Sequence, residues 1–186
     1  LSEILGSVGG TKPAKQAKAD SESAGKDDFA AQRSTVAALA DLTSAPAYHL
    51  AEGFESTDNL VAIYYDALDW KGQSTKVFAW LGRPDVSSNS IPAVVLVHGG
   101  GGTAFKDWVR RWNDRGYAAI SIAVEGQTDQ KDGKAWESHA WAGPKRSGIY
   151  GDSAEPLEYQ WMYHAVADTI LANSLIRTID GVDPSR

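Results

Sequence analysis

A continuous apolar strand that runs directly into four glycines constrains the fold of this chain most. Residues 93–97 read Ala-Val-Val-Leu-Val, and His98, the glycines at 99–102 and Thr103 follow. An unbroken apolar run rich in β-branched side chains is typical of a strand buried on both faces of a parallel sheet. Consecutive glycines cost conformational entropy, so they are expected where backbone must approach another group closely. The segment therefore predicts an α/β protein with a functional turn at the end of a buried strand.

The residues after the turn predict a strand–helix–strand unit. A helix is expected over about residues 105–115, with Gly116 at the position of a C-terminal cap. Residues 117–124 form a second apolar run, and a helical crossover makes this strand parallel to the first. Trp108 and Trp112 have helical spacing, so we expect both in the core of the domain.

Three further segments complete the predicted fold. Residues 60–68 and 76–81 alternate apolar and polar side chains on either side of a turn, which predicts an antiparallel hairpin. Residues 125–155 are polar and dotted with Gly and Trp, and loops this long inside a domain are usually functional. Residues 157–179 predict a long helix. Two core strands alone leave a buried sheet edge open, so we expect the sheet to be incomplete in this chain.

The first residues differ in composition from the rest. Residues 1–27 are rich in Ser, Ala, Lys and Gly and carry almost no large apolar side chain after Val8. Such a segment buries too little surface to offset its chain entropy, so a flexible arm is expected. A folded domain is expected over residues 28–186, beginning with a short helix that ends near Ala40.

The net charge and the absence of cysteine exclude several classes of function. The formal net charge is −6, the isoelectric point is about 5.2 and no basic stripe appears, so nucleic acid is not an expected partner. No apolar run approaches the roughly 20 residues that span a bilayer, so no membrane partner is expected. Without cysteine there are no disulfides and no thiolate catalysis. A start at Leu1 is not a native initiation site, and the acidic, cysteine-free composition leans towards a secreted or periplasmic protein.

The glycine turn allows three interpretations. In the first, backbone N–H groups of the turn bind the oxygen that becomes negative during ester hydrolysis, which makes the turn an oxyanion hole. In the second, Gly99, Gly101 and Ala104 match the dinucleotide fingerprint G-x-G-x-x-A. Glu125 then stands where a ribose-binding acid follows the next strand. In the third, the turn holds no ligand. The preceding hairpin argues against the second interpretation, because that fingerprint normally follows the first strand of its domain.

Several segments together form a recognisable pattern. They are Val-Leu-Val-His-Gly-Gly-Gly-Gly-Thr-Ala-Phe at 95–105, Trp108-Val109, Trp112, Arg-Gly-Tyr-Ala at 115–118, Trp-Met-Tyr-His-Ala-Val at 161–166 and Leu-Ile-Arg at 175–177. With these segments the sequence resembles the acetyl xylan esterase and dienelactone hydrolase-like branch of the α/β-hydrolase superfamily. The resemblance covers roughly residues 61–186.

This resemblance implies an α/β-hydrolase-type, mostly parallel sheet with an N-terminal antiparallel hairpin, of which residues 28–186 form the N-terminal part. It also implies a serine carboxylic-ester hydrolase, such as an acetyl xylan-type carbohydrate esterase. Gly100 matches the position that gives an oxyanion N–H, Gly101 is the second choice, and His98 matches the histidine that supports the loop. In this fold the nucleophilic Ser of G-x-S-x-G, the acid and the catalytic His all follow the oxyanion loop.

The sequence ends before any of these three residues is expected. We therefore expect a fragment, or one chain of a nicked or split enzyme, that is inactive alone. Its expected partners are the remainder of the hydrolase domain, which carries Ser, Asp and His, and a small ester or acetylated carbohydrate. No cofactor or metal is expected. Two alternatives stay open: an NAD(P)-binding oxidoreductase domain, and a non-catalytic hydrolase-like protein that only binds.

Aromatic side chains of the long loop are candidates for substrate binding. Trp136, Trp141 and Tyr150 follow the carboxyl end of a strand, where α/β folds place their ligands. The alternative is that these rings pack the loop against the domain. The segment Gly-Asp-Ser-Ala-Glu at 151–155 begins like a nucleophile elbow with Ser153 as its serine. However, Glu155 stands where the elbow needs a small glycine. For Ser153 we therefore favour a loop serine that caps the following helix.

Overall fold

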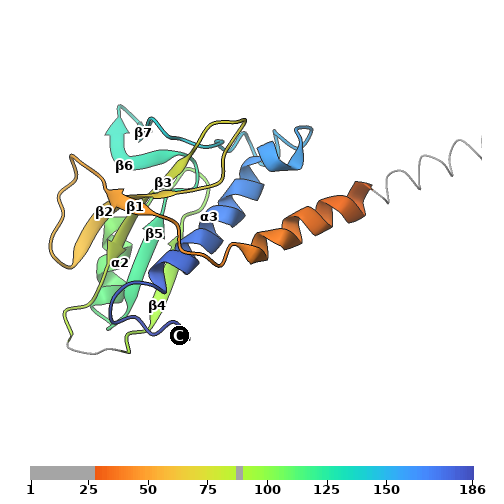
Figure 1. Ribbon diagram of the computed structural model, residues 1–186. Helices are drawn as coiled ribbons and strands as arrows, with labels where there is room; N and C mark the ends of the chain where they lie inside the picture. Colours follow the sequence, from red (N-terminus) through yellow and green to blue (C-terminus); the bar gives the residue numbers. More distant parts are fainter. Residues whose placement is uncertain (1–27, 87–89) are drawn as a thin grey trace, which may run out of the picture. The chain divides into compact units, whose positions relative to one another are not determined.

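The computed structural model describes residues 28–86 and 90–186 (Figure 1). Its contacts divide the chain into two units, residues 1–37 and 38–186. Within the first unit residues 28–37 are helical, as the sequence predicts. The flexible arm predicted for residues 1–27 lies outside the described residues. None of the helices in the described residues is long and apolar enough to cross a membrane.

The second unit is built on a five-stranded sheet with the order β1-β2-β3-β5-β4 (Figure 1). The strands are β1 (Tyr48–Leu50), β2 (Leu60–Asp66), β3 (Lys76–Gly82), β4 (Ala93–Val97) and β5 (Ala118–Ile122). The predicted hairpin is confirmed as β2 and β3, which pair antiparallel. The predicted parallel pair is confirmed as β4 and β5. In this chain the parallel part of the sheet is limited to that pair, because β3 and β5 run antiparallel.

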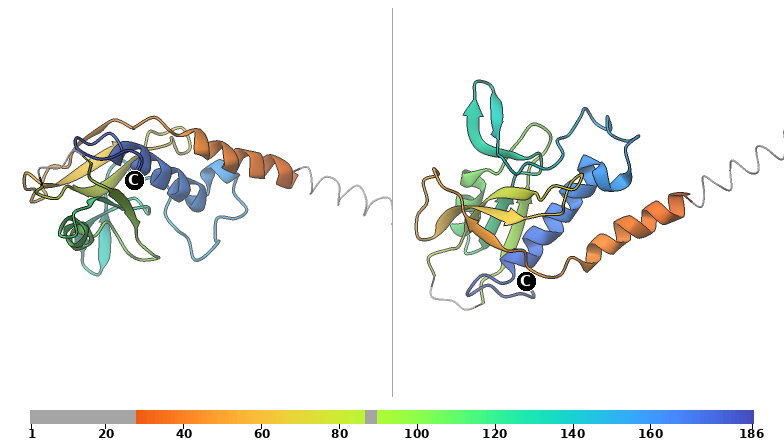
Figure 2. Two further views of the ribbon diagram at one scale, coloured as in Figure 1. Left: turned by 90° about the horizontal axis from the view of Figure 1, so that it is seen from below. Right: turned by 45° about the horizontal axis from the view of Figure 1, so that its top comes forward.

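Two helices cover the two faces of the sheet. They are α2 (Lys106–Asn113) and α3 (Trp161–Ile176), the second preceded by a 3-10 turn, η2 (Leu157–Tyr159). Side chains alternate across a strand, so Val77 and Ala79 of β3 join the apolar cluster under α3, while Phe78 joins the one under α2. Figure 2 shows the green α2 and the blue α3 on opposite sides of the strands. The domain is therefore a three-layer α/β structure.

The strand that leads into the glycine turn is an edge strand. The prediction that residues 93–97 are buried on both faces is wrong, because β4 is only partly buried and Val97 is 41% exposed. β4 pairs with β5 on one side, and among the described residues no strand pairs with its other side. The strand that is fully buried is β5. The sheet edge that was expected to lack a neighbouring strand is therefore the outer side of β4.

Two other details differ from the sequence-based expectations. The long loop contains a small hairpin, β6 (Gln127–Asp132) and β7 (Ala135–Ser138), which forms a separate two-stranded sheet. Trp108 was expected in the core but is 36% exposed. The buried side of α2 is centred on Val109, and Trp112 packs partly buried on the same side. Trp108 lies at the margin of that side and contacts Phe105, with ring centroids 4.8 Å apart.

Candidate active site

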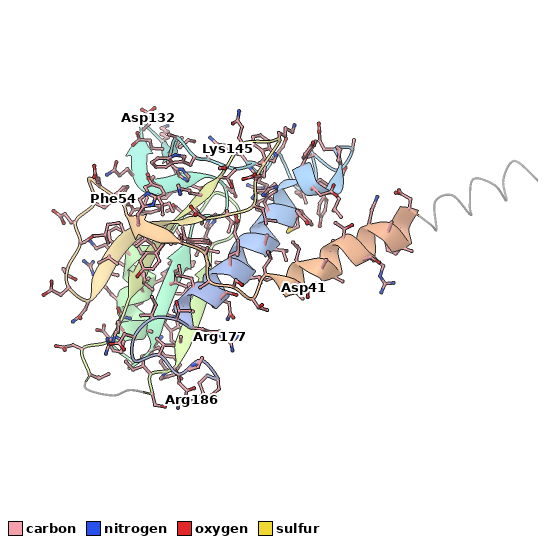
Figure 3. All side chains as sticks on the ribbon, in the orientation of Figure 1. Asp41, Phe54, Asp132, Lys145, Arg177 and Arg186 are labelled. Carbon is pink, nitrogen blue, oxygen red and sulfur yellow. The ribbon has the colours of Figure 1, made fainter. Side chains whose placement is uncertain are left out.

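The glycine turn lies at the carboxyl end of β4, beside the segment that follows β5. The two strands are parallel, so both carboxyl ends meet at one edge of the sheet. The Gln127 side-chain amide donates to the Gly102 carbonyl at 2.7 Å and ties the two segments together. This edge is the end of the domain marked by Asp132 and Lys145 in Figure 3, opposite Arg177 and Arg186. Open α/β sheets bind their ligands at such carboxyl ends.

The glycines of the turn are required for different reasons. Gly101 has a φ of +76°, a backbone conformation that L side chains rarely adopt. A Cβ at Gly102 would lie 2.8 Å from the Cβ of His98, and a Cβ at Gly100 would lie 2.9 Å from Cζ of Arg146. A Cβ at Gly99 would meet nothing within 4 Å. The run of glycines therefore combines one special backbone angle with two close approaches.

The hydrogen bonds of the turn use its carbonyls and leave its central amides unpaired. The Gly99 carbonyl accepts from the Gly102 N–H at 3.0 Å, and the Gly101 carbonyl accepts from the indole N–H of Trp136 at 2.9 Å. Within the described parts of the chain, no acceptor is bonded to the N–H groups of Gly100 and Gly101. Both residues are exposed. The N–H of Gly99, which is also exposed, likewise has no acceptor among the described residues. The turn thus presents three backbone donors to solvent, or to a ligand that replaces solvent, and Gly100 and Gly101 are two of them.

His98 lies buried beneath the turn. Its Nδ1 bonds to the Gly99 carbonyl at 2.7 Å, and its Nε2 accepts from the Val124 N–H at 3.1 Å. This pair of bonds requires the proton on Nδ1 and a lone pair on Nε2. The Nε2 lone pair is therefore engaged by backbone, and His98 joins the turn to the end of β5 rather than facing a substrate.

An ion pair that the sequence analysis did not find covers the turn. Arg146 Nε lies 3.3 Å from a carboxylate oxygen of Glu125, and Arg146 Nη1 donates to the Gly148 carbonyl at 2.7 Å. The Glu125 side chain is only 16% exposed and that of Arg146 is 31% exposed. Arg146 stands in a polar loop without a motif, so only the folded structure shows its place against Gly100.

The structure brings one of the three candidate aromatic residues to the turn. Trp136 of β7 donates its indole N–H to Gly101, and its ring meets Phe105 edge-on at 6.1 Å between centroids. Trp141 instead packs against Tyr64 at 5.3 Å between ring centroids. Tyr150 is 71% exposed, and its side chain forms no hydrogen bond within the described residues. For Trp141 and Tyr150, a substrate-binding role stays a prediction.

An apolar groove of about 350 Å³ lies beside the open edge of β4. Its lining comes from the end of β4, the end of β5 and one side of α3: Val97, His98, Val124, Trp161, Met162, Ala165, Val166, Thr169 and Ile170. Val97, Met162 and Val166 are 41%, 47% and 39% exposed. Apolar side chains of three elements thus reach solvent next to the edge strand of the sheet.

The sequence model for acetyl xylan esterase (AXE1) matches residues 15–186. The chain belongs to the acetyl xylan esterase family. The α/β-hydrolase fold predicted from the sequence is confirmed. A search of curated proteins found no match.

Two solved structures of acetyl xylan esterases share this fold. The enzyme from Paenibacillus sp. R4 has 21% sequence identity and a TM-score of 0.54, with 82% of this chain and 48% of that chain covered. Acetyl xylan esterase 1 from Thermoanaerobacterium sp. JW/SL YS485 has 13% identity and a TM-score of 0.54, with 82% and 47% covered. The chain therefore spans about half the length of these acetyl xylan esterases.

Membership of the acetyl xylan esterase family favours the ester-hydrolase interpretation over the dinucleotide one. The carboxylate of Glu125, which that alternative assigns to a ribose, is bonded to Arg146, and the guanidinium of Arg146 lies against Gly100. The prediction that Ser153 caps the next helix is wrong, because the Trp161 N–H at the start of α3 is bonded to the Asp152 carboxylate at 2.6 Å. Ser153 itself is exposed in the preceding turn.

Three buried or partly buried titratable side chains of this acetyl xylan esterase family member have shifted pKa values. Burial raises the pKa of Asp168 to about 8, and its Oδ1 has no hydrogen-bond partner within the described residues. Burial, followed by the charge of Lys145, lowers the pKa of His139 to about 4. Burial also lowers the pKa of His164, whose Nε2 lies 2.9 Å from the Glu158 carbonyl. All three side chains are therefore expected to be uncharged near neutral pH.

Proposed function

We propose that this chain is the front part of a serine carboxylic-ester hydrolase that removes acetyl groups from carbohydrate, and that its glycine turn is the oxyanion hole. The observation that carries this proposal is the pair of unpaired amides at Gly100 and Gly101, at the carboxyl end of β4. Membership of the acetyl xylan esterase family supports the substrate class.

In the proposed reaction a serine Oγ attacks the carbonyl carbon of the ester, and a histidine takes the serine proton. A bond forms between Oγ and carbon, and the carbonyl oxygen becomes negative. Amides of Gly100 and Gly101 donate to that oxygen, each donor contributing roughly 3 kcal/mol by analogy with a known side-chain donor. The intermediate then expels the alcohol, which takes the proton from histidine. Water releases the acid in the same way.

The nucleophile, the acid and the base are proposed to lie on the remainder of the domain. On the side of β4 that faces away from β5, the Ala93 N–H bonds to the Arg186 carbonyl, and no described strand pairs with the rest of that edge. The edge beyond Ala93 gives the remaining polypeptide a strand to extend, and the neighbouring apolar groove gives it a surface to cover. The solved relatives are about twice as long as the matched region, which is consistent with this assignment. By itself the chain is proposed to be inactive.

The residues around the turn then have supporting roles. We propose that His98 fixes the path of the loop through its bonds to Gly99 and Val124. Trp136 fixes the Gly101 carbonyl, and its ring lies close enough to the turn to contact the sugar that carries the acetyl group. We assign no role at the turn to Trp141 and Tyr150, because their interactions do not involve it.

A matched pair of glycine variants in the full-length protein tests the proposal. Gly101 and Gly116 have φ angles of +76° and +85°, and a Cβ at either would meet nothing within 4 Å. Alanine at either site therefore causes similar backbone strain in similar open space. Gly101→Ala turns the proposed donors away, so its rate of acetyl ester hydrolysis should fall about 100-fold or more. Gly116→Ala, beyond the far end of α2, should keep the wild-type rate.

The readout is kcat/KM for 4-nitrophenyl acetate and for acetylated xylan, with circular dichroism to compare folding. Equal losses in both variants would show that strain, not the donors, controls activity. A wild-type protein that binds acetylated carbohydrate without hydrolysing it would favour the non-catalytic alternative.

A further inference from the structure

The guanidinium of Arg146 lies flat against the glycine turn. A Cβ on Gly100 would lie 2.9 Å from Cζ, 2.9 Å from Nη2 and 3.2 Å from Nε of Arg146. Gly100 does not have a positive φ, so its own backbone angle does not call for glycine. The missing side chain at residue 100 is instead explained by the guanidinium, which needs that space. The turn and Arg146 are thus one packed unit.

Arg146 is held so that one nitrogen stays available. Nε bonds to Glu125 at 3.3 Å and Nη1 bonds to the Gly148 carbonyl at 2.7 Å. Nη2, which lies against Gly100, has no acceptor within the described residues. The arginine side chain is 31% exposed, so a ligand from solvent can reach it. A guanidinium is always charged and presents its donors in a fixed plane, which matches a carboxylate.

Among the described residues, the N–H groups of Gly100 and Gly101 and Nη2 of Arg146 therefore all lie at this turn without an acceptor. Consecutive backbone N–H groups form concavities that bind anions. Hydrogen bonds from a charged donor to an ionised acceptor are about twice as strong as neutral ones. A small carboxylate satisfies such a group of donors because it offers two oxygens, one for the amides and one for the guanidinium.

We propose that Arg146 and the amides of Gly100 and Gly101 form a carboxylate-binding site that retains the acid released by ester hydrolysis. During hydrolysis the positive charge of the guanidinium lies beside the oxygen that becomes negative in the intermediate and stabilises it. Glu125 acts as a positioning residue, since its bond to Nε fixes the plane of the guanidinium. This inference rests on the proposed function, but the carboxylate site itself is measurable without hydrolysis.

The experiment titrates sodium acetate into the full-length protein, with sodium chloride at equal ionic strength as the reference. Nitrogen-15 spectra follow the Gly100 and Gly101 amide signals, and initial rates follow inhibition by acetate. In the wild type, acetate should shift both amides and inhibit competitively. Arg146→Gln should weaken acetate binding at least 10-fold and lower kcat/KM about 10-fold or more. Arg146→Lys keeps the charge but loses the planar group of donors. Its acetate affinity and its kcat/KM should lie between those of the wild type and those of Arg146→Gln.

Two further variants test whether acetate binding depends on the position of the guanidinium rather than on the net charge of the protein. Arg111→Gln removes the same charge from an exposed position on α2 and should leave acetate binding unchanged. Gly100→Ala displaces the guanidinium and should weaken acetate binding as Arg146→Gln does. If Arg146→Gln does not fold, the comparison of Arg146→Lys with Arg111→Gln gives the same test.

The outcomes distinguish this inference from the proposed function. An active enzyme whose acetate binding and kcat/KM do not depend on Arg146 overturns the inference and leaves the function in place. Acetate shifts at Gly100 that require Arg146, in a protein without hydrolase activity, support the carboxylate site and overturn the function. If Arg111→Gln and Arg146→Gln weaken acetate binding equally, the weakening comes from the change in net charge, and the inference is overturned.

Discussion

Ionisation of Asp168 should make the domain less stable as the pH rises. The side chain lies on α3 at 6% exposure, its Oδ1 has no hydrogen-bond partner within the described residues, and burial raises its pKa to about 8. In the unfolded chain the same carboxyl ionises near its ordinary pKa of about 3.9. Between these two values the folded state keeps a proton that the unfolded state has lost. Folding stability therefore falls with rising pH across this window and levels off above about pH 8.

The size of this loss of stability follows from the difference in proton binding between the folded and the unfolded state. One proton of difference changes the free energy of unfolding by about 1.4 kcal/mol per pH unit. Between pH 4 and pH 7 the loss attributable to Asp168 is about 4 kcal/mol, a large share of the stability of an ordinary domain. His139 and His164 act in the opposite direction below about pH 6.5, because burial lowers their pKa values and the unfolded state takes up protons first.

Urea unfolding at a series of pH values measures this slope for the wild type and for Asp168→Asn. The asparagine variant cannot ionise, and the histidine contributions cancel in the difference between the two proteins. The difference in unfolding free energy should therefore change by about 1.4 kcal/mol per pH unit between pH 5 and pH 7, in favour of the variant. Asp114→Asn, at an exposed position, should leave the slope of the wild type unchanged. Parallel pH profiles for the wild type and Asp168→Asn would refute the assignment of a raised pKa to this carboxyl.

Three further predictions concern the turn and its surroundings. Gly102→Ala places a Cβ 2.8 Å from the Cβ of His98 and should lower the free energy of unfolding by about 1–3 kcal/mol in urea titrations, whereas no loss would mean that the loop moves aside without cost. Trp136→Phe removes the N–H bonded to the Gly101 carbonyl at 2.9 Å, so kcat/KM for an acetyl ester should fall about 5- to 10-fold, and an unchanged value would show that this bond does not position the turn. The imidazole of His139 should stay neutral down to about pH 4 in nitrogen-15 spectra, and a midpoint near 6.5 would contradict its burial.

The sequence predicted those parts of the fold that follow from local pattern and connection. Alternation in residues 60–68 and 76–81 indicated the β2–β3 hairpin, and the helical crossover fixed β4 and β5 as parallel. The hairpin β6–β7 was missed because residues 127–138 are polar and lack an apolar face. The β1 strand was missed because it has three residues, all exposed.

The site was predictable only where a motif marks it. The glycine run directed attention to the turn, and the resemblance to the acetyl xylan esterase branch implied an oxyanion role for Gly100 and Gly101 and a supporting role for His98. Arg146 carries no such mark, because its contact with Gly100 depends on how a polar loop folds back over the end of the sheet. Apolar periodicity placed Trp108 in the core, but α2 is eight residues long and buries only the side centred on Val109.

The most direct test of the account is the structure of the full-length protein with a phosphonate analogue of the tetrahedral intermediate bound to its nucleophile. If the glycine turn is the oxyanion hole, the negatively charged analogue oxygen lies about 2.7–3.1 Å from the backbone nitrogen of Gly100 or Gly101. An analogue oxygen held by other donors, with both of these amides still facing solvent, would contradict it.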